Sequence, residues 1–294
     1  MQSEKTYDFY FAQVQKALES CTDNLWQKDS KVSEGARYSL MNGGKRVRGV
    51  LTLAVCDMLK GDMEGAAFYA AAVEMVHAYS LVHDDLPCMD NDDYRRGKPS
   101  CHKAFDETTA LLAGDALLTE AFEVLASSGL SDKQNMRAVQ ILSGGAGARG
   151  MIYGQELDLF FEKQQTLTVE ELTQVHRHKT GALINAAVQM GAVAAEATAR
   201  QREVLEEFAL RLGFVFQIVD DVLDVISTTD VLGKPVGSDV HNGKITFASL
   251  KGIKGCREFA AALTQEAICI LEETFGAQAE FLAGYASSLL ERTH

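Results

Sequence analysis

The amino-acid sequence predicts an all-α protein, and three observations carry that prediction. Only 3 of the 294 residues are proline, whereas average usage of about 5% would give roughly fifteen. Apolar residues recur at helical spacing, as in Val73, Val76, Tyr79 and Val82. Capping boxes at Ser131–Gln134 and Thr168–Glu171 mark two helix starts. Because no segment alternates as a strand does, about ten or more helices are expected from typical helix lengths.

Composition limits the class of protein. No composition shift, linker or internal repeat divides the chain, so one domain over residues 1–294 is predicted. No apolar run approaches the ~18 residues of a membrane span, and the N-terminus lacks the pattern of a secretory signal. We therefore expect a cytoplasmic protein without stable membrane insertion. A net charge of −13 argues against nucleic-acid binding, and six scattered cysteines without a C-x-x-C pair argue against zinc and disulfides.

A stripe of carboxylates interrupts an otherwise apolar helical segment, residues 214–226. At about 100° per residue, Asp220, Asp221 and Asp224 fall within a ~100° arc, with Gln217 close to its edge. Ionised carboxylates in such surroundings require cationic partners or a metal, because burying them unpaired is costly. A solvated outer face is the alternative, but the neighbouring residues are mostly apolar. The segment therefore favours a metal site.

The segment 66–85 repeats this arrangement, since an apolar helix ends in Asp84 and Asp85. Asp90 follows after Pro87. On one continuous helix Asp84 and Asp90 would lie about 120° apart. Proline lacks an N–H and clashes with the preceding turn, so we expect the helix to break here and Asp90 to fold back towards Asp84.

The ion that suits these motifs is Mg²⁺. A calcium-binding loop is excluded because its sixth position, a glycine, would be Arg95, and its twelfth, a glutamate, would be Cys101. Magnesium needs only one or two carboxylates and takes its other oxygens from water and phosphate. The acidic motifs therefore predict a phosphorylated substrate.

Basic residues that could hold phosphate occur in several places. They lie in Gly43–Arg48, Arg95–Arg96 and His176–Thr180, and at Lys234 and Lys244. A solvated surface remains an alternative for each cluster except Arg95–Arg96, which lies within five residues of Asp90. His77 lies on nearly the same helix face as Asp84, so it is either a ligand or a core histidine. Two glycine patterns carry no function: Gly145–Gly150 lacks a preceding strand, and no Gly-Lys pair completes a P-loop.

Several motifs in register resemble the bacterial farnesyl diphosphate synthases of the short-chain trans-prenyltransferase family. They are GGKRVR, HAYSLVHDDLPCMDNDDYRRGKP, LLAGDALL, GQELDL, HKTGAL, FQIVDDVLD and GKPVGSDVHNGKITF, across about residues 40–250. The resemblance implies the isoprenoid synthase fold, a helical bundle around a deep central cavity, and a homodimer. Both aspartate motifs would face each other at the mouth of that cavity.

The resemblance also implies roles for individual residues. Mg²⁺ would be bound by Asp84, Asp90 and Asp220, supported by Asp85, Asp221 and Asp224. The allylic diphosphate would be held by Arg95, Lys179, Lys234 and Lys244. Isopentenyl diphosphate would be held by Lys45, Arg48, His77 and Arg96. Thr180 and Gln217 would lie near the allylic carbon.

Two neighbouring residues are candidates for setting product length. The family position five residues before the first aspartate motif is Tyr79, where a bulky aromatic would floor the cavity. An ideal helical wheel instead favours Ser80, which lies about 40° from Asp84. The chain departs from the family pattern at three positions: Gly49, Ile245 and Phe247.

The implied reaction condenses isopentenyl diphosphate with dimethylallyl or geranyl diphosphate to give farnesyl diphosphate. Metal and cationic side chains would stabilise the departing diphosphate. A geranylgeranyl diphosphate synthase would share every ionic residue and is the nearest alternative. A class I terpene cyclase would not combine these motifs, and a non-catalytic regulatory subunit should lack some of the aspartates. The starter, the product ratio and the dimer surface stay open.

Overall fold

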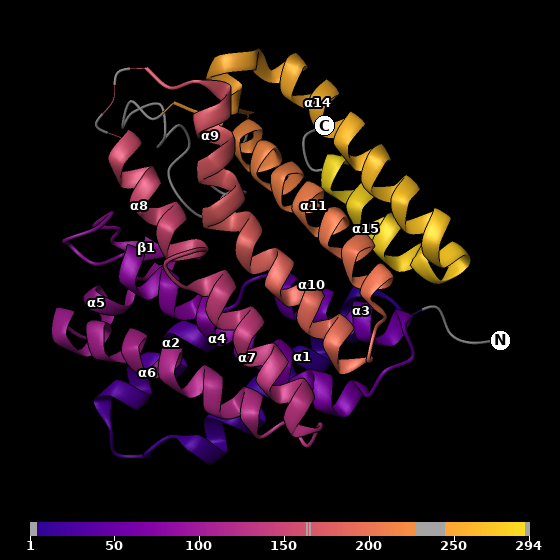
Figure 1. The fold of residues 1–294 in the computed structure, drawn as a ribbon. Helices are drawn as coiled ribbons and strands as arrows, with labels where there is room; N and C mark the ends of the chain where they lie inside the picture. The colour runs from indigo at the N-terminus through magenta and orange to yellow at the C-terminus, as the bar shows by residue number, and fades with distance from the viewer. Residues whose placement is uncertain (1–4, 163, 165, 227–244, 292–294) are drawn as a thin grey trace.

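The structure is a computed structural model that describes residues 5–162, 164, 166–226 and 245–291. Over this part of the chain it confirms the all-α prediction, with more than ten α-helices (Figure 1). Lys234 and Lys244, two of the predicted diphosphate ligands, lie outside the described residues.

The described part of the N-terminal half contains seven helices and one short hairpin. The helices are α1 (Tyr7–Leu25), α2 (Lys31–Met41), α3 (Val47–Met58), α4 (Met63–Asp84), α5 (Cys101–Ala104), α6 (Glu107–Ala126) and α7 (Asp132–Ala146). Between α4 and α5, β1 (Tyr94–Arg95) pairs antiparallel with β2 (Lys98–Pro99). The sequence patterns do not predict this hairpin, because two residues per strand cannot show alternation. Its turn is formed by Arg96 and Gly97, which both have positive φ as two-residue hairpin turns require.

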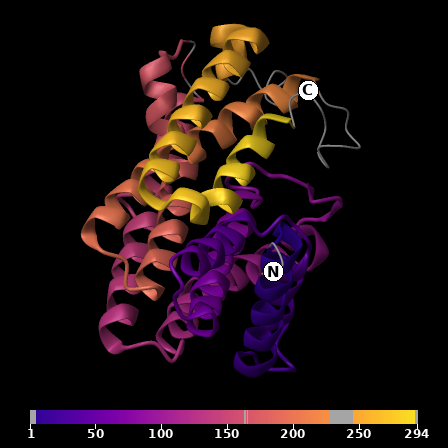
Figure 2. The ribbon, with the colours of Figure 1, turned by 90° about the vertical axis from the view of Figure 1, so that its right-hand side faces the viewer.

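The C-terminal half continues the bundle. It contains α8 (Met151–Phe161), α9 (Val169–His176), the π-helical turn η1 (Arg177–Gly181), α10 (Ala182–Ala194), α11 (Ala199–Ile226), α14 (Phe247–Phe275), the 3₁₀ turn η2 (Gly276–Ala279) and α15 (Glu280–Glu291). Helices α11, α14 and α15 pack side by side. Figure 2 shows these orange and yellow helices above the indigo N-terminal ones.

Helix α4 is central to the packing. It contacts α1, α2, α3, α6, α7 and α10, so most of its side chains are buried all round, as expected for a helix without a polar face. One cluster of buried apolar residues extends from α1 to α15. The acidic end of α4 is therefore fixed by a helix that most of the bundle surrounds.

Local signals in the sequence are confirmed at several points. The capping boxes at Ser131–Gln134 and Thr168–Glu171 begin α7 and α9. Gly145 packs against α10, where an added Cβ would lie 2.8 Å from the Cβ of Ala186, so this glycine serves helix packing. None of the described helices has the length and apolar character needed to cross a membrane.

Candidate active site

The first acidic motif forms where α4 ends. The helix stops at Asp84, and the chain turns through Pro87 so that the N–H of Asp90 donates to the carbonyl of Asp84 at 2.9 Å. The predicted break and return of Asp90 are thus confirmed. Both carboxylates belong to one compact turn.

Asp84 is in an environment that lacks sufficient positive charge. Burial, together with the charges of Asp90 and Asp85, raises the pKa of Asp84 to about 6. Lys179, the largest opposing influence, lowers it. A carboxylate in this state favours an additional cation.

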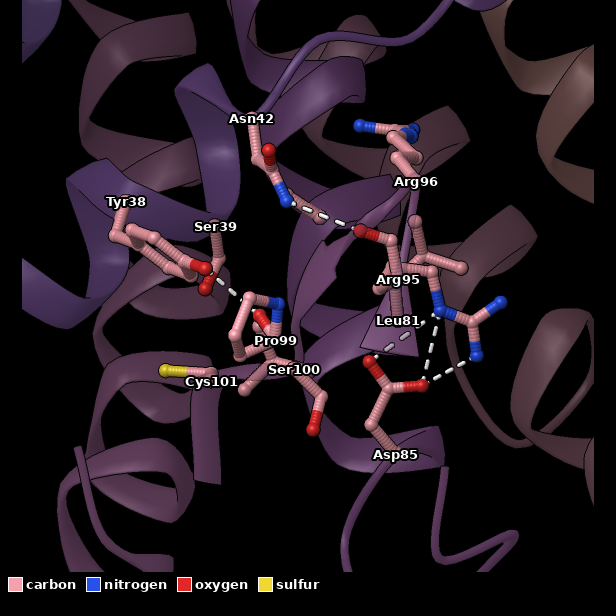
Figure 3. A pocket seen from close by; sticks show the side chains of 12 residues that line it. Tyr38, Ser39, Asn42, Leu81, Asp85, Arg95, Arg96, Pro99, Ser100 and Cys101 are labelled. Atoms are coloured by element: carbon pink, nitrogen blue, oxygen red, sulfur yellow. Dashed lines mark hydrogen bonds and ion pairs between the residues drawn. The ribbon is translucent and has the colours of Figure 1, made fainter. Parts of the chain in front are cut away.

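The hairpin after this turn carries two arginines that point in different directions (Figure 3). Arg95 donates through Nε to both oxygens of Asp85 at 2.9 and 3.3 Å, and through Nη2 to Asp92 at 3.1 Å. Asp85, only 2% exposed, is therefore the partner of Arg95. Burial raises the pKa of Asp85, although the hydrogen bonds from Arg95 oppose that shift.

Arg96 lies instead on the glycine loop that precedes α3. Its Nη1 donates to the carbonyl of Gly43 at 2.7 Å, and a Cβ on Gly44 would lie 2.5 Å from its guanidinium carbon. The loop needs glycine for this contact and for its positive φ values. A second hydrogen bond joins the hairpin to this loop, because Asn42 donates to the carbonyl of Arg95 at 3.2 Å (Figure 3).

Arg96 belongs to a group of basic side chains with Arg48 and His77. Burial lowers the pKa of Arg96 to about 10 and also lowers the pKa of Arg48. Burial and the neighbouring arginines together hold the pKa of His77 well below its usual value, so this imidazole is neutral. Nε of Arg48 is buried without a hydrogen-bond partner within the described part of the chain. Such a group suits an anion.

Lys45 lies at the edge of this group. It is exposed and lines a cavity of about 480 Å³ together with Tyr7 of α1 and Tyr285 of α15. The hydroxyl of Tyr7 donates to the carbonyl of Lys45, and the rings of Tyr7 and Tyr285 stack with centroids 5.8 Å apart.

Lys179 and Thr180 lie in the π-helical turn η1, a distortion that is frequent at functional sites. Lys179 Nζ forms an ion pair with Asp158 of α8 at 2.6 Å. A close crossing makes this contact possible, since a Cβ on Gly154 would lie 2.0 Å from the backbone nitrogen of Lys179. Thr180 donates to Gln217 Oε1 of α11 at 2.9 Å.

The second acidic motif lies on the C-terminal half of α11. Gln217 Nε2 donates to Asp221 at 3.3 Å, and the N–H of Phe247 donates to its other oxygen at 2.8 Å. Asp221 and Asp224 are buried, whereas Asp220 is half-buried and its charge acts on Arg48. The predicted stripe is thus divided between Asp221, which holds α14, and Asp220, which faces the basic group.

The two candidates for product length differ in their surroundings. Tyr79 is 5% exposed and meets His83 edge to face, with ring centroids 5.7 Å apart. Burial raises the pKa of Tyr79 to about 12. Ser80 donates to the carbonyl of His77 at 2.9 Å within its own helix. Of the two, only Tyr79 has a bulky side chain.

The donor set agrees with Mg²⁺. Within the described residues no group of three or more His, Cys, Asp or Glu side chains is arranged to hold a metal ion by itself. Magnesium usually takes one or two carboxylates and completes its shell with water and phosphate. Asp84 and Asp90 supply such a pair, and the raised pKa of Asp84 marks a place where a cation is favourable.

Several residues with a clear part in this site are absent from the sequence-based prediction. Asp158 pairs with Lys179, Asn42 holds the hairpin, and Glu74 contacts the start of α3. Asp158 lies in the motif GQELDL, but its partner is 21 residues away on another element, and spacing does not reveal such pairs.

Comparison with known proteins decides the family. The sequence profile of the polyprenyl synthetase family matches residues 29–279. The chain belongs to this family. It is a trans-prenyltransferase with the isoprenoid synthase fold.

Relatives of this trans-prenyltransferase differ in the product that their names state. The farnesyl diphosphate synthase of Micrococcus luteus is 44% identical over 240 residues, covering 82% of each chain. The geranylgeranyl pyrophosphate synthase of Catharanthus roseus is 45% identical over 256 residues, covering 86% of this chain and 71% of that one. A Helicobacter pylori geranyltransferase solved with magnesium and isoprenyl diphosphate matches with a TM-score of 0.84 at 34% identity, covering 99% and 98%.

Proposed function

We propose that this trans-prenyltransferase condenses isopentenyl diphosphate with dimethylallyl and geranyl diphosphate, with Mg²⁺, to give farnesyl diphosphate. The observation that carries the proposal is a pair of groups with opposite ligand preferences. Asp84 and Asp90 beside Lys179 favour a cation that could bridge them to a diphosphate, and Arg48, Arg96 and His77 favour an anion.

The first site suits an ionising allylic diphosphate. Asp84 and Asp90 would hold Mg²⁺ together with Asp220, and Asp85, Asp221 and Asp224 would support them. When bound, the metal would neutralise charge on the leaving diphosphate. Arg95 and Lys179, with Lys234 and Lys244, would hold diphosphate oxygens. Arg95 and Lys179 already have carboxylate partners in Asp92 and Asp158, which keep both cations in place.

The second site suits a diphosphate that stays intact. Arg48 and Arg96 would form charge-assisted hydrogen bonds to isopentenyl diphosphate, and the neutral His77 could donate one more. Lys45 would contact the same group from the outer edge. Thr180 and Gln217 would lie near the allylic carbon as its bond to oxygen breaks. No side chain need take the proton, since the departing diphosphate can accept it.

Product length is the finer part of the proposal. Tyr79 supports a C15 product because a buried tyrosine lies five residues before Asp84. A geranylgeranyl diphosphate synthase is the second candidate, favoured by relatives of that name at similar identity. The test is to incubate purified protein with isopentenyl diphosphate, each starter and Mg²⁺, and to weigh the products after phosphatase treatment. A C15 product supports the proposal, C20 supports the alternative, and no condensation would reassign the chain as a regulatory subunit.

We also propose one domain, a homodimer and a cytoplasmic location. The continuous hydrophobic core supports one domain. Exposed apolar side chains on α6, α7 and α8 support a second copy as partner: Leu111, Leu112, Met136, Ile152, Tyr153 and Phe160. The location rests on the sequence alone. Sedimentation of the protein measures the oligomeric state directly.

A further inference from the structure

Arg46 and Glu74 form a buried ion pair at the start of α3, and neither is among the proposed substrate or metal ligands. Arg46 Nη1 lies 3.8 Å from Glu74 Oε2, and both side chains are 1% exposed. Arg46 also donates from Nε to Gln15 of α1 at 2.8 Å and from Nη2 to the carbonyl of Leu40 at 2.6 Å. The guanidinium therefore joins α1, α2 and α4.

The other oxygen of Glu74 holds the first turn of α3. Glu74 Oε1 accepts the N–H of Gly49 at 3.0 Å, one of the amides that have no partner within a helix. Arg46 precedes the helix with φ of 51°, a left-handed conformation that non-glycine residues adopt only when their surroundings enforce it. Glu74 thus contacts both sides of the helix start.

Arg48 occupies the turn that these contacts fix. It directly precedes Gly49, and its buried Nε has no hydrogen-bond partner within the described residues. His77 lies one turn after Glu74 on the same face of α4. Burial lowers the pKa of Arg48, and the Glu74 carboxylate opposes that shift. The charge of Glu74 therefore stabilises the protonated guanidinium of Arg48.

We propose that Glu74 is a positioning residue for isopentenyl diphosphate. Through Arg46 and the Gly49 N–H it fixes the first turn of α3, and so it determines where Arg48 presents its guanidinium. This inference rests on the proposed function, which assigns Arg48 to that substrate. Among the described residues, Glu74 and Arg46 form no hydrogen bond or ion pair with the aspartates at the end of α4, so the allylic half of the site should not depend on them.

Arg46 allows a second test of the ion pair from its other side. Arg46→Gln removes the guanidinium that joins Glu74 to α1 and α2. If Glu74 acts through this guanidinium, Glu74→Gln, Arg46→Gln and the double variant should have similar effects, because changes at two residues in contact are not additive. The double variant also leaves no unpaired charge buried.

The experiment measures kcat and both KM values of these variants with isopentenyl and geranyl diphosphate at saturating Mg²⁺. Glu74→Gln, which keeps an acceptor for the N–H of Gly49 but loses the charge beside Arg46, should raise the KM for isopentenyl diphosphate on the order of ten-fold, with the KM for geranyl diphosphate unchanged. Arg46→Gln and the double variant should raise the same KM to a similar extent.

An unchanged KM for isopentenyl diphosphate in Glu74→Gln, or equal increases for both substrates, would overturn the positioning role. Failure of the proposed function looks different, because the unaltered enzyme would then fail to condense the two substrates. Circular dichroism at the assay temperature ensures that only folded variants are compared. If Glu74→Gln does not fold, the double variant, in which neither partner is left as a buried unpaired charge, still decides the question.

Discussion

The two acidic motifs differ in how far the protein itself satisfies them. At the end of α4, Asp84 has too little positive charge around it, as its raised pKa indicates, and Asp90 is exposed. On α11, Asp221 accepts hydrogen bonds from Gln217 and from the N–H of Phe247. The first motif is therefore prepared for an external cation, whereas part of the second is structural. Similar sequence motifs do not imply equal roles for their aspartates.

The largest effect should come from Asp84→Asn. Removing this charge weakens the proposed Mg²⁺ site and leaves the departing diphosphate less stabilised, so turnover should fall by about three orders of magnitude. Asp220→Asn should have a similar effect. Steady-state kinetics at saturating Mg²⁺, with circular dichroism as the control for folding, measures this. Near-normal turnover in both variants would reject the metal assignment.

The next effect should come from Arg48→Gln, which acts on the basic group rather than on either acidic motif. Its KM for isopentenyl diphosphate should rise by about ten-fold or more, because a charge-assisted bond contributes roughly 1.5–3 kcal/mol. The KM for geranyl diphosphate should change little. Equal increases for the two substrates would show that the proposed separation of the allylic and isopentenyl diphosphate sites is wrong.

Asp221→Asn tests whether the second acidic motif has a structural role through the two hydrogen bonds that Asp221 accepts. An amide can keep only one of the two acceptor oxygens, so the bond to Phe247 or to Gln217 is lost and stability should fall by about 1–3 kcal/mol. Asp220→Asn should lower stability less, because Asp220 is half-buried whereas Asp221 is buried. Urea unfolding of both variants measures the difference, and equal midpoints would contradict the separation of roles on α11.

The sequence predicts those parts of the site that depend on neighbouring residues. The break at Pro87 follows from the covalent structure of proline, and the return of Asp90 follows from the break. The stripe on α11 is likewise a property of one helix. The roles of Asp220 and Asp221 nevertheless differ, because the position of Phe247 depends on how α14 packs.

Contacts between distant elements could not be predicted. The ion pair of Lys179 with Asp158 forms only where α8 crosses η1. The hydrogen bond from the N–H of Gly49 to Glu74 forms only because α3 packs beside α4. The hairpin at Tyr94–Pro99 is too short for any periodicity. In each case tertiary packing determines which residues meet, and a single sequence does not reveal that packing.

Tyr79→Ala tests whether the length of the product can change while the rate of condensation stays the same. The substitution removes a buried ring near Asp84 without removing a proposed ligand, so longer products should appear while the rate of condensation is largely retained. Ser80→Ala is the matched control, since the Ser80 hydroxyl donates a hydrogen bond to its own helix and the change removes little volume. Product mass after phosphatase treatment is the measurement. An unchanged C15 product from an active Tyr79→Ala enzyme would place the floor of the cavity elsewhere.

The smallest effect should come from Glu120, a carboxylate outside both acidic motifs. Its substitution tests whether a raised pKa alone identifies a functional residue. Burial raises the pKa of Glu120 on α6 to about 7, although Trp26 donates a hydrogen bond to this side chain. A folded-state pKa above the unfolded value means that the folded protein loses stability as pH rises from about 4.5 to 7. Glu120→Gln avoids this cost.

Glu120→Gln should therefore be more stable than the unaltered enzyme at pH 8 by about 1 kcal/mol, a figure reduced for solvent screening because the side chain is partly exposed. The advantage should disappear near pH 4, where the glutamate is protonated in both states. Thermal unfolding across this pH range, with kcat measured at pH 8, provides the test. Because the described partners of Glu120 are Trp26 and Glu123 rather than proposed ligands, kcat should stay constant. A large fall would mean that the raised pKa marks a functional group at Glu120, as we propose for Asp84.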